Sequence, residues 1–200
     1  MILDKIKDIG YFIANVKNKS HVLRTRAKYG QWSDLVTRIP DALMFAIIDF
    51  VEKECFWMNV AFTEEKNKCN LELEVKKYIE QSYIKRKIFS VNVSDSVRAK
   101  HARLWMDFQN EHTPEDIKPY DELWEAYLFA KNKYFNFNEY EESGLNALIK
   151  DDRDCDFFKK EERHEVIEAY DKIRKLREDF EIEVEKHCIN IVKYRQSMWT

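Results

Sequence analysis

The sequence predicts an all-α protein, an irregular multi-helix bundle with a long C-terminal helix and at most one small β element. The chain of 200 residues contains only 3 Gly and 3 Pro, which disfavours sandwiches and barrels because those folds need many tight turns. Apolar residues recur at intervals of three and four over most of the chain, which is the period of an amphipathic helix. Hydrophobic residues make up 44% of the chain, which is enough for one core. We expect a single helical domain over residues 1–200, with residues 63–100 as a charged appendage or insertion.

The first half of the chain predicts two main helices. The first is indicated by three-and-four spacing of apolar residues near the N-terminus: Ile2, Ile6, Ile9, Phe12, Ile13 and Val16. The second is expected to begin at Pro40, because the missing N–H of proline has no helical partner in a first turn. From Pro40 to Phe62 apolar side chains cover nearly the whole helix circumference, which is typical of a helix enclosed by others. We expect this helix at the centre of the core.

The middle of the chain predicts shorter elements. A weaker helix is expected over residues 71–83, and residues 88–93 alternate β-forming side chains in the manner of a short strand. Ser94 or Ser96 is expected to cap a helix that continues to Phe108. Thr113 and Pro114, followed by two acids, predict another helix start, and Pro119 forces a restart before a helix over residues 120–135.

The last part of the chain predicts a short helix over residues 139–149 and then a very long one. The long helix is expected from Phe157 to about Ser197, since no Gly or Pro interrupts it. Its core side is indicated by Tyr170, Ile173, Phe180, Val184, His187, Ile191 and Tyr194. Roughly 40 residues would span about 60 Å, which exceeds the width of a compact domain of this size. We expect the helix to bend, to break, or to project and pair with another chain in a homo-oligomer or with a protein partner.

Composition bounds the compartment and the partners. Charged residues make up 36% of the chain but leave a net charge of only -3, so no global charge favours nucleic acid or a membrane surface. No apolar run reaches the roughly 18 residues of a membrane span, and the charged first turns do not resemble a signal peptide. The four cysteines show no CxxC spacing, so we expect reduced thiols and a cytoplasmic protein.

Two carboxylates interrupt the apolar second helix. Asp49 and Glu52 lie three residues apart, with Asp41 on a neighbouring line, so at least one is expected to be partly buried and to need a partner. Arg38 or Arg195 is expected to supply that partner. One interpretation is a polar pocket or metal site, and the other is a structural ion pair that sets the helix register. The ion pair is favoured, since structural pairs perturb acids as readily as active sites do.

An alternative hypothesis is a Mg²⁺-dependent nucleotide pyrophosphohydrolase of the all-α type. Such an enzyme needs acidic pairs on two helices, whose carboxylates converge on Mg²⁺ that bridges the phosphates. The pairs Glu139/Glu142 and Glu168/Asp171 have the required spacing. Because the chain has 37 acids, such pairs also arise by chance. No motif for nucleophilic catalysis, a phosphate-binding loop or a zinc or iron site is present, and no cofactor is expected otherwise.

A second alternative is nucleic-acid binding through the basic segment, residues 76–103. This segment holds eight Lys or Arg against two acids, a local net charge of +6. Tyr78, Tyr83 and Phe89 are interleaved with the cations, and backbones and bases of nucleic acids attract such side chains. A solvated helix face is favoured over this hypothesis, because no recognised binding motif accompanies the charge.

Two stretches resemble an uncharacterised family of tailed-phage proteins. WSDLVTRIPDALMFAIIDFVEKE is similar to a family segment with a Trp-x-Asp-x-Asp-x-Arg run and a helix ending Asp-Phe-Val-Glu, and HCINIVKYRQSMWT is similar to the family's C-terminus. The matching residues are Trp32, Asp34, Arg38, Asp49, Phe50, Val51, Glu52, Arg195, Trp199 and Thr200. The sequence departs where Asp41 and Leu43 replace a His and an Asn of the family and Val36 replaces the second Asp. The resemblance implies a phage origin and no particular reaction.

These observations favour binding over catalysis. The leading hypothesis is a phage accessory protein that binds a host factor, a small ligand or a virion component in the cytoplasm of the infected cell or in the virion. The candidate binding residues are Trp32, Asp34, Arg38, Asp49, Glu52 and Arg195. The polar residues that depart from the core pattern gather near the stretch that resembles the phage family, so a site is expected there.

Overall fold

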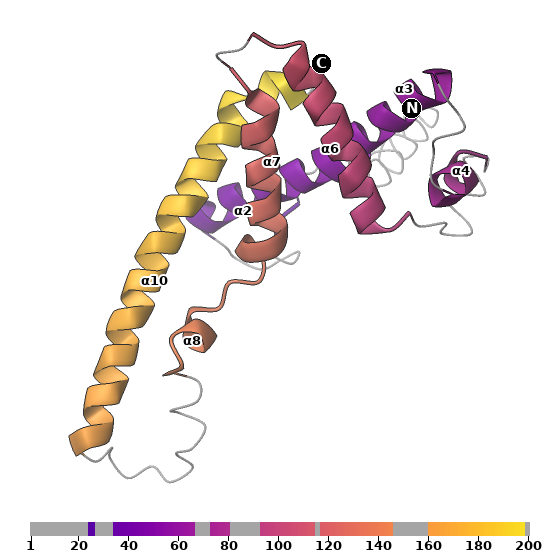
Figure 1. The fold of residues 1–200 in the computed structure, drawn as a ribbon. Helices are drawn as coiled ribbons and strands as arrows, with labels where there is room; N and C mark the ends of the chain where they lie inside the picture. Colours follow the sequence, from indigo (N-terminus) through magenta and orange to yellow (C-terminus); the bar gives the residue numbers. More distant parts are fainter. Residues whose placement is uncertain are drawn as a thin grey trace, which may run out of the picture.

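The computed structural model describes residues 24–26, 34–66, 73–80, 93–114, 117–145 and 160–198. These residues form helices and no strand, which confirms the all-α fold with a long C-terminal helix (Figure 1). The predicted N-terminal helix lies outside the described residues. So do residues 88–92 of the predicted strand, and Val93 has no regular structure.

A helical rod runs through the bundle from Leu35 to Lys66. It consists of α2 (Leu35–Asp49), the π-helical segment η2 (Phe50–Cys55) and α3 (Phe56–Lys66). The prediction that this helix begins at Pro40 is wrong. The carbonyl of Asp34 accepts hydrogen bonds from the backbone N–H groups of Thr37 and Arg38, so the first turn closes earlier and Pro40 lies inside the helix. Pro40 has no N–H to donate to the carbonyl of Val36, so one hydrogen bond of the helix is missing at this point.

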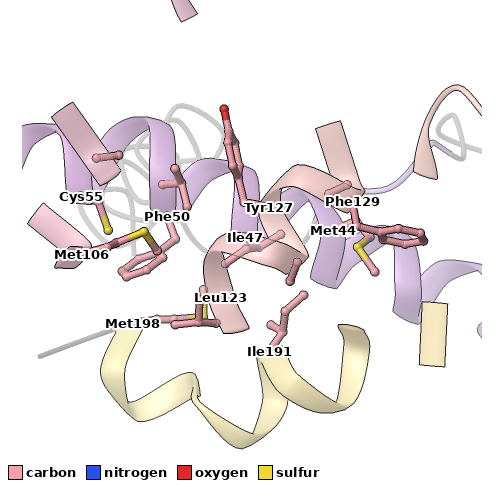
Figure 2. Packing of buried hydrophobic residues seen from close by; sticks show 14 of the residues in the cluster. Met44, Ile47, Phe50, Cys55, Met106, Leu123, Tyr127, Phe129, Ile191 and Met198 are labelled. Carbon is pink, nitrogen blue, oxygen red and sulfur yellow. The ribbon is translucent and has the colours of Figure 1, made fainter. Parts of the chain in front are cut away.

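The main core forms where three further helical elements pack against the rod. These are α6 (Asp95–Glu111), α7 (Pro119–Phe129) with its π-helical extension η4 (Ala130–Tyr134), and the C-terminal part of α10 (Lys160–Lys193) with the 3-10 turn η5 (Arg195–Met198). Figure 2 shows side chains of the rod, α6, α7 and the C-terminal turn meeting in one cluster. Met44, Ile47, Val51, Met106 and Leu123 are fully buried.

The rod is enclosed over only part of its length. Its α2 and η2 portions carry the fully buried side chains of the core, whereas Trp57 and Met58 on α3 are 41% and 42% exposed. On its other side α3 meets α4 (Leu73–Glu80) in a small separate cluster of Phe56, Val60, Val75 and Val93. The prediction of an enclosed helix over residues 40–62 is therefore correct for residues 40–52, where no side chain is exposed, and wrong for α3.

The turns between the helices correct one predicted boundary and confirm another. Thr113 was expected to cap a new helix, but its hydroxyl donates to the carbonyl of Gln109, so it closes the end of α6. The restart at Pro119 is confirmed, because Pro119 occupies the first turn of α7. The helix expected over residues 120–135 is confirmed as α7 with η4. Ser94 precedes α6 as expected, although its hydroxyl contacts Glu74 instead of an N–H of the helix.

Helix α10 extends well beyond the bundle (Figure 1). Its 34 residues span about 51 Å at 1.5 Å per residue. The C-terminal half packs on α7 and α2, while the N-terminal half meets the short helix α8 (Glu139–Glu142) and a small cluster of Leu145, Ala169 and Ile173. The chain leaves the α-helix at Lys193 and turns through η5, so the long helix both projects and ends in a break. None of the described helices is long and apolar enough to cross a membrane.

Candidate binding surfaces

The five predicted site residues that the structure describes do not form one cluster. Asp34 and Arg38 lie exposed at the start of α2, and Arg195 lies exposed on η5, where its guanidinium donates to the carbonyl of Val192. Trp32 lies outside the described residues. Asp49 and Glu52 sit in the middle of the rod, each in an ion pair described below. The structure therefore separates these residues instead of gathering them at one pocket.

Asp41 is the most buried carboxylate of the rod, with 2% of its surface exposed. It accepts hydrogen bonds from the backbone N–H and Nε of Arg26 at 3.0 and 2.9 Å and from the Tyr134 hydroxyl at 2.8 Å. Burial alone would raise the pKa of Asp41, but these hydrogen bonds outweigh burial and lower it. The Arg26 guanidinium also lies over the rings of Tyr134 and Phe135. This arrangement is an ion pair between a buried carboxylate and an arginine whose side chain is half exposed.

Glu52, the third residue of η2, belongs to a second ion-pair network. Its Oε1 accepts from Nζ of Lys131 at 2.7 Å and from the hydroxyl of Tyr127 at 3.1 Å. Lys131 also donates to Asp95 at 2.7 Å. Burial alone would lower the pKa of Lys131, but the hydrogen bonds to Asp95 and Glu52 outweigh it and raise that pKa. Burial and the Glu52 carboxylate raise the pKa of Tyr127 to about 12. In Figure 2 the Tyr127 hydroxyl points away from the apolar cluster.

Asp49 is the third of these carboxylates of the rod, and its partners differ from the predicted ones. Its carboxylate pairs with Arg24 and, at 2.7 Å, with Lys53 one turn further along the rod. Among the described residues the cations that meet the three acids are thus Arg24, Arg26, Lys53 and Lys131, whereas Arg38 and Arg195 had been expected. The ion-pair interpretation of Asp49 and Glu52 agrees with this geometry, since each carboxylate already has a cation against it.

The four carboxylates of the magnesium hypothesis lie on α8 and α10. Glu139 pairs with Arg177 at 2.7 Å, Glu168 pairs with His164 at 3.2 Å, and Asp171 pairs with Arg174 at 3.0 Å. Glu142 lies exposed at the end of α8. Within the described ranges no group of three or more His, Cys, Asp or Glu side chains is placed to hold a metal ion. The structure therefore does not bring these four acids together.

The arginines in the described part of the basic segment contact the chain itself. Arg98 donates to the carbonyls of Val93 and Glu52 and lies over the Phe56 ring. Arg103 pairs with Asp107 and Asp121, each at 2.8 Å. Residues 81–92 lie outside the described part, and with them Lys85, Arg86 and Lys87.

An open cavity of about 520 Å³ lies where η2 and α3 meet α6, the start of α7 and η5. Its apolar lining comes from Phe50, Cys55, Met58, Trp105 and Met198, and its polar lining from Glu54, Gln109, Tyr120 and Ser197. Tyr120 donates to the Ser197 carbonyl at 3.1 Å and so ties η5 to α7 beside the cavity. Burial raises the pKa of the Cys55 thiol well above its usual range. The sequence does not reveal this cavity, because its walls come from five separate elements.

The outer face of α10 carries an apolar stripe that the sequence analysis also missed. Five side chains on this face are between 44% and 66% exposed: Ile167, Tyr170, Ile182, Ile189 and Val192. At 100° per residue they fall within one third of the helix circumference, and the buried Ile173, His187 and Ile191 lie on a different face. Tyr170 had been predicted on the core side and is 55% exposed, so that prediction is wrong. We name this face the α10 stripe.

Comparison with known proteins adds no relative to these observations. No protein-family model matches the chain, and no curated protein or solved structure is similar to it. Among the described residues, the α10 stripe and the cavity beside η5 are the surfaces best suited to bind another molecule.

Proposed function

We propose that this protein is a phage accessory protein that acts by binding another protein chain along the α10 stripe. The observation that carries the proposal is the row of five large apolar side chains exposed on a helix that projects from the bundle. The phage origin rests on the resemblance of residues 32–54 and 187–200 to a tailed-phage family. The proposed place of action is the cytoplasm of the infected cell or the virion.

The energetics of the stripe support binding by a protein. Covering a large aliphatic or aromatic side chain stabilises a complex by about 1.5–3 kcal/mol when it goes from full exposure to full burial. The five residues are already about half covered by their own helix, so a partner would add roughly half of that for each. A regular helix face is the shape that another helix or an apolar groove matches best. Exposed apolar side chains gathered on one helix face, here as the pairs Ile167/Tyr170 and Ile189/Val192 with Ile182 between them, mark interaction sites more often than singly scattered ones do.

The proposal is tested by measuring the mass of the protein in solution. Size-exclusion chromatography with light scattering at tens of micromolar is expected to give a mass above that of the single chain, 24.3 kDa. Ile189→Glu places a charge in the stripe and is expected to reduce the mass to that of one chain. Lys172→Glu, which changes an exposed residue on another face of α10, is the matched control and is expected to leave the mass unchanged. A single-chain mass for the wild-type protein would count against the proposal.

A second candidate function is the binding of a small ligand with an apolar body in the cavity beside η5. The observation that favours it is the combination of Trp105, Phe50 and Met58 with the carboxylate of Glu54 in one opening of about 520 Å³. An apolar fluorescent probe such as anilinonaphthalene sulfonate is expected to bind there and to lose that binding in Met58→Glu. Equal probe fluorescence in both proteins would reject this candidate.

A further inference from the structure

Charged residues lie between the apolar residues of the α10 stripe and share its face. Together they form a line of eight exposed residues, four apolar and four charged: Ile167, Tyr170, Arg174, Glu178, Glu181, Glu185, Ile189 and Val192. The intervals between them are 3, 4, 4, 3, 4, 4 and 3, which is the same order from either end. Ile182 flanks this line. The pattern repeats every 11 residues, a period close to that of a straight α-helix, so the line stays on one face over its whole length.

A palindromic spacing lets a second copy of the helix match the first in the antiparallel direction. With the two-fold axis between Asp179 and Phe180, Ile167 lies opposite Val192 of the second copy and Tyr170 lies opposite its Ile189. Each of these apolar contacts occurs twice, because the axis repeats it at the other end. The apolar residues thus meet at both ends of the pairing, and the charged residues meet in the middle.

The charges also match in this register. Arg174 lies opposite Glu185 of the second copy, and symmetry provides the same pair again on the other side of the axis. In the isolated chain Arg174 contacts only the exposed Asp171 of its own helix among the described residues, and its side chain remains 73% exposed. Near the axis Glu178 lies opposite Glu181 of the second copy, and Glu181 lies opposite its Glu178. The centre of the pairing is therefore weakly repulsive.

A parallel arrangement of two α10 helices fits the same residues poorly. It would place Arg174 against Arg174, Glu178 against Glu178, Glu181 against Glu181 and Glu185 against Glu185. The parallel pair would then contain four contacts between like charges and no ion pair. The antiparallel pair contains two ion pairs between Arg174 and Glu185 and two contacts between Glu178 and Glu181, and it keeps the apolar contacts at the ends.

From this match we infer that the partner of the α10 stripe is a second copy of this chain, paired antiparallel with Arg174 opposite Glu185. This inference rests on the proposed function, since it names the partner of the same surface. A two-fold pairing uses the stripe of both chains and closes on itself, so the assembly is a dimer and does not grow further.

Charge exchange tests the register. Arg174→Glu and Glu185→Arg each place two like-charged contacts at the interface and are each expected to weaken the dimer about tenfold, which sedimentation equilibrium measures. The double variant Arg174→Glu/Glu185→Arg restores opposite charges across the interface and is expected to recover most of the wild-type affinity. Glu181→Gln removes repulsion at the axis and is expected to tighten the dimer.

A photo-crosslinking residue in place of Tyr170 tests the direction. p-Benzoylphenylalanine at this position is expected to label the peptide that contains Ile189 of the second copy, and labelling of residues 167–174 would instead indicate a parallel pair. If Ile189→Glu disrupts an assembly but the charge exchange does not restore affinity, or the mass is that of a trimer or larger, the antiparallel dimer is wrong and binding through the stripe stands. A single-chain mass for the wild-type protein would overturn both.

Discussion

The ammonium of Lys131 lies 2.7 Å from Oε1 of Glu52, and this contact joins the two π-helical segments η4 and η2. The Glu52 side chain is only 15% exposed. We expect Glu52→Gln to lower the free energy of unfolding by about 1–2 kcal/mol, because Lys131 then loses a charged partner in a partly buried position. Urea unfolding followed by circular dichroism measures this change.

Asp95 provides the control for that experiment, since it contacts the same lysine from a side chain that is 67% exposed. We expect Asp95→Asn to lower the free energy of unfolding by less than about 0.5 kcal/mol, as is usual for exposed ion pairs. Equal losses for the two variants would show that burial of Glu52 has no special weight in this network.

We expect Asp41 to contribute more to the free energy of unfolding than any exposed acid of the chain does. Asp41→Asn keeps the volume of the side chain but removes the charge that Arg26 and Tyr134 contact, so we expect a loss of about 2 kcal/mol at neutral pH. Tyr134→Phe removes one of the same hydrogen bonds and is expected to cost about 1 kcal/mol. Denaturant unfolding of both variants tests the order of the two effects.

The lowered pKa of Asp41 predicts that the free energy of unfolding depends on pH in the acid range. The folded-state pKa of Asp41 is lowered, so the unfolded chain binds this proton more readily, and the contribution of Asp41 is complete above the unfolded pKa of roughly 3.9. It is lost as the pH falls through the folded pKa. We expect the difference in stability between the wild-type protein and Asp41→Asn to shrink as unfolding is measured at progressively lower pH below 4. A constant difference over that range would contradict this assignment.

His187 predicts a second pH dependence at a milder pH. The ring is buried, stacks on Phe129 at 4.5 Å between centroids, and its Nδ1 makes no hydrogen bond with the described residues. Burial and then the charge of Lys186 lower the pKa of His187, although Glu122, Glu125 and Glu183 act in the opposite direction. Because the folded pKa is depressed, this group stabilises the fold fully above the unfolded pKa of roughly 6.5, and the fold loses stability as the pH falls below it.

Replacement of His187 tests this sign. We expect the free energy of unfolding of the wild-type protein to decrease between roughly pH 7 and pH 5, and His187→Phe to decrease less over the same range because the titrating ring is gone. His164→Gln is the control, since His164 lies on the same helix with its side chain 77% exposed. It is expected to follow the wild-type curve.

Leu123 tests the main core. It is fully buried between the rod and the C-terminal turn (Figure 2). We expect Leu123→Ala to lower the free energy of unfolding by about 3 kcal/mol through lost burial and the cavity that remains. Leu128→Ala, at a position 40% exposed on the same helix, is expected to cost about 1 kcal/mol or less. Thermal unfolding ranks the two variants.

The sequence predicted the existence of the main helices because the three-and-four spacing of apolar residues is a local property of the chain. Helix boundaries were less predictable. Pro40 and Thr113 are common at helix starts, but the Asp34 carbonyl opens the rod earlier and the Gln109 carbonyl engages the Thr113 hydroxyl. In both places a hydrogen bond to a backbone carbonyl that the sequence does not reveal determined the helix boundary.

The partners of the polar residues were the least predictable feature. Glu52 and Lys131 are 79 residues apart in the sequence, and Asp41 and Arg26 are 15 residues apart. A chain with 34 Lys and Arg offers many equivalent cations, so only the tertiary arrangement selects one. Arg38 was closer in sequence to Asp41 but lies on the exposed first turns of α2. The α10 stripe, in contrast, follows from the spacing of Ile167, Tyr170, Ile182, Ile189 and Val192 in the sequence.

The π-helical segment η2 makes the rod tolerant of one change in chain length. A π-helical turn holds one residue more than an α-helical turn, so deletion of one residue between 50 and 55 would let the rod close as a continuous α-helix. Because the wider turn advances the chain by the same angle as an α-helical turn with one residue fewer, Phe56 and Met58 would keep their faces relative to α2. The same deletion within α2 or α3 would instead rotate every later side chain of the rod by roughly 100°. A homologue shorter by one residue in this segment would therefore keep the cluster around Phe56 and the cavity that Met58 lines.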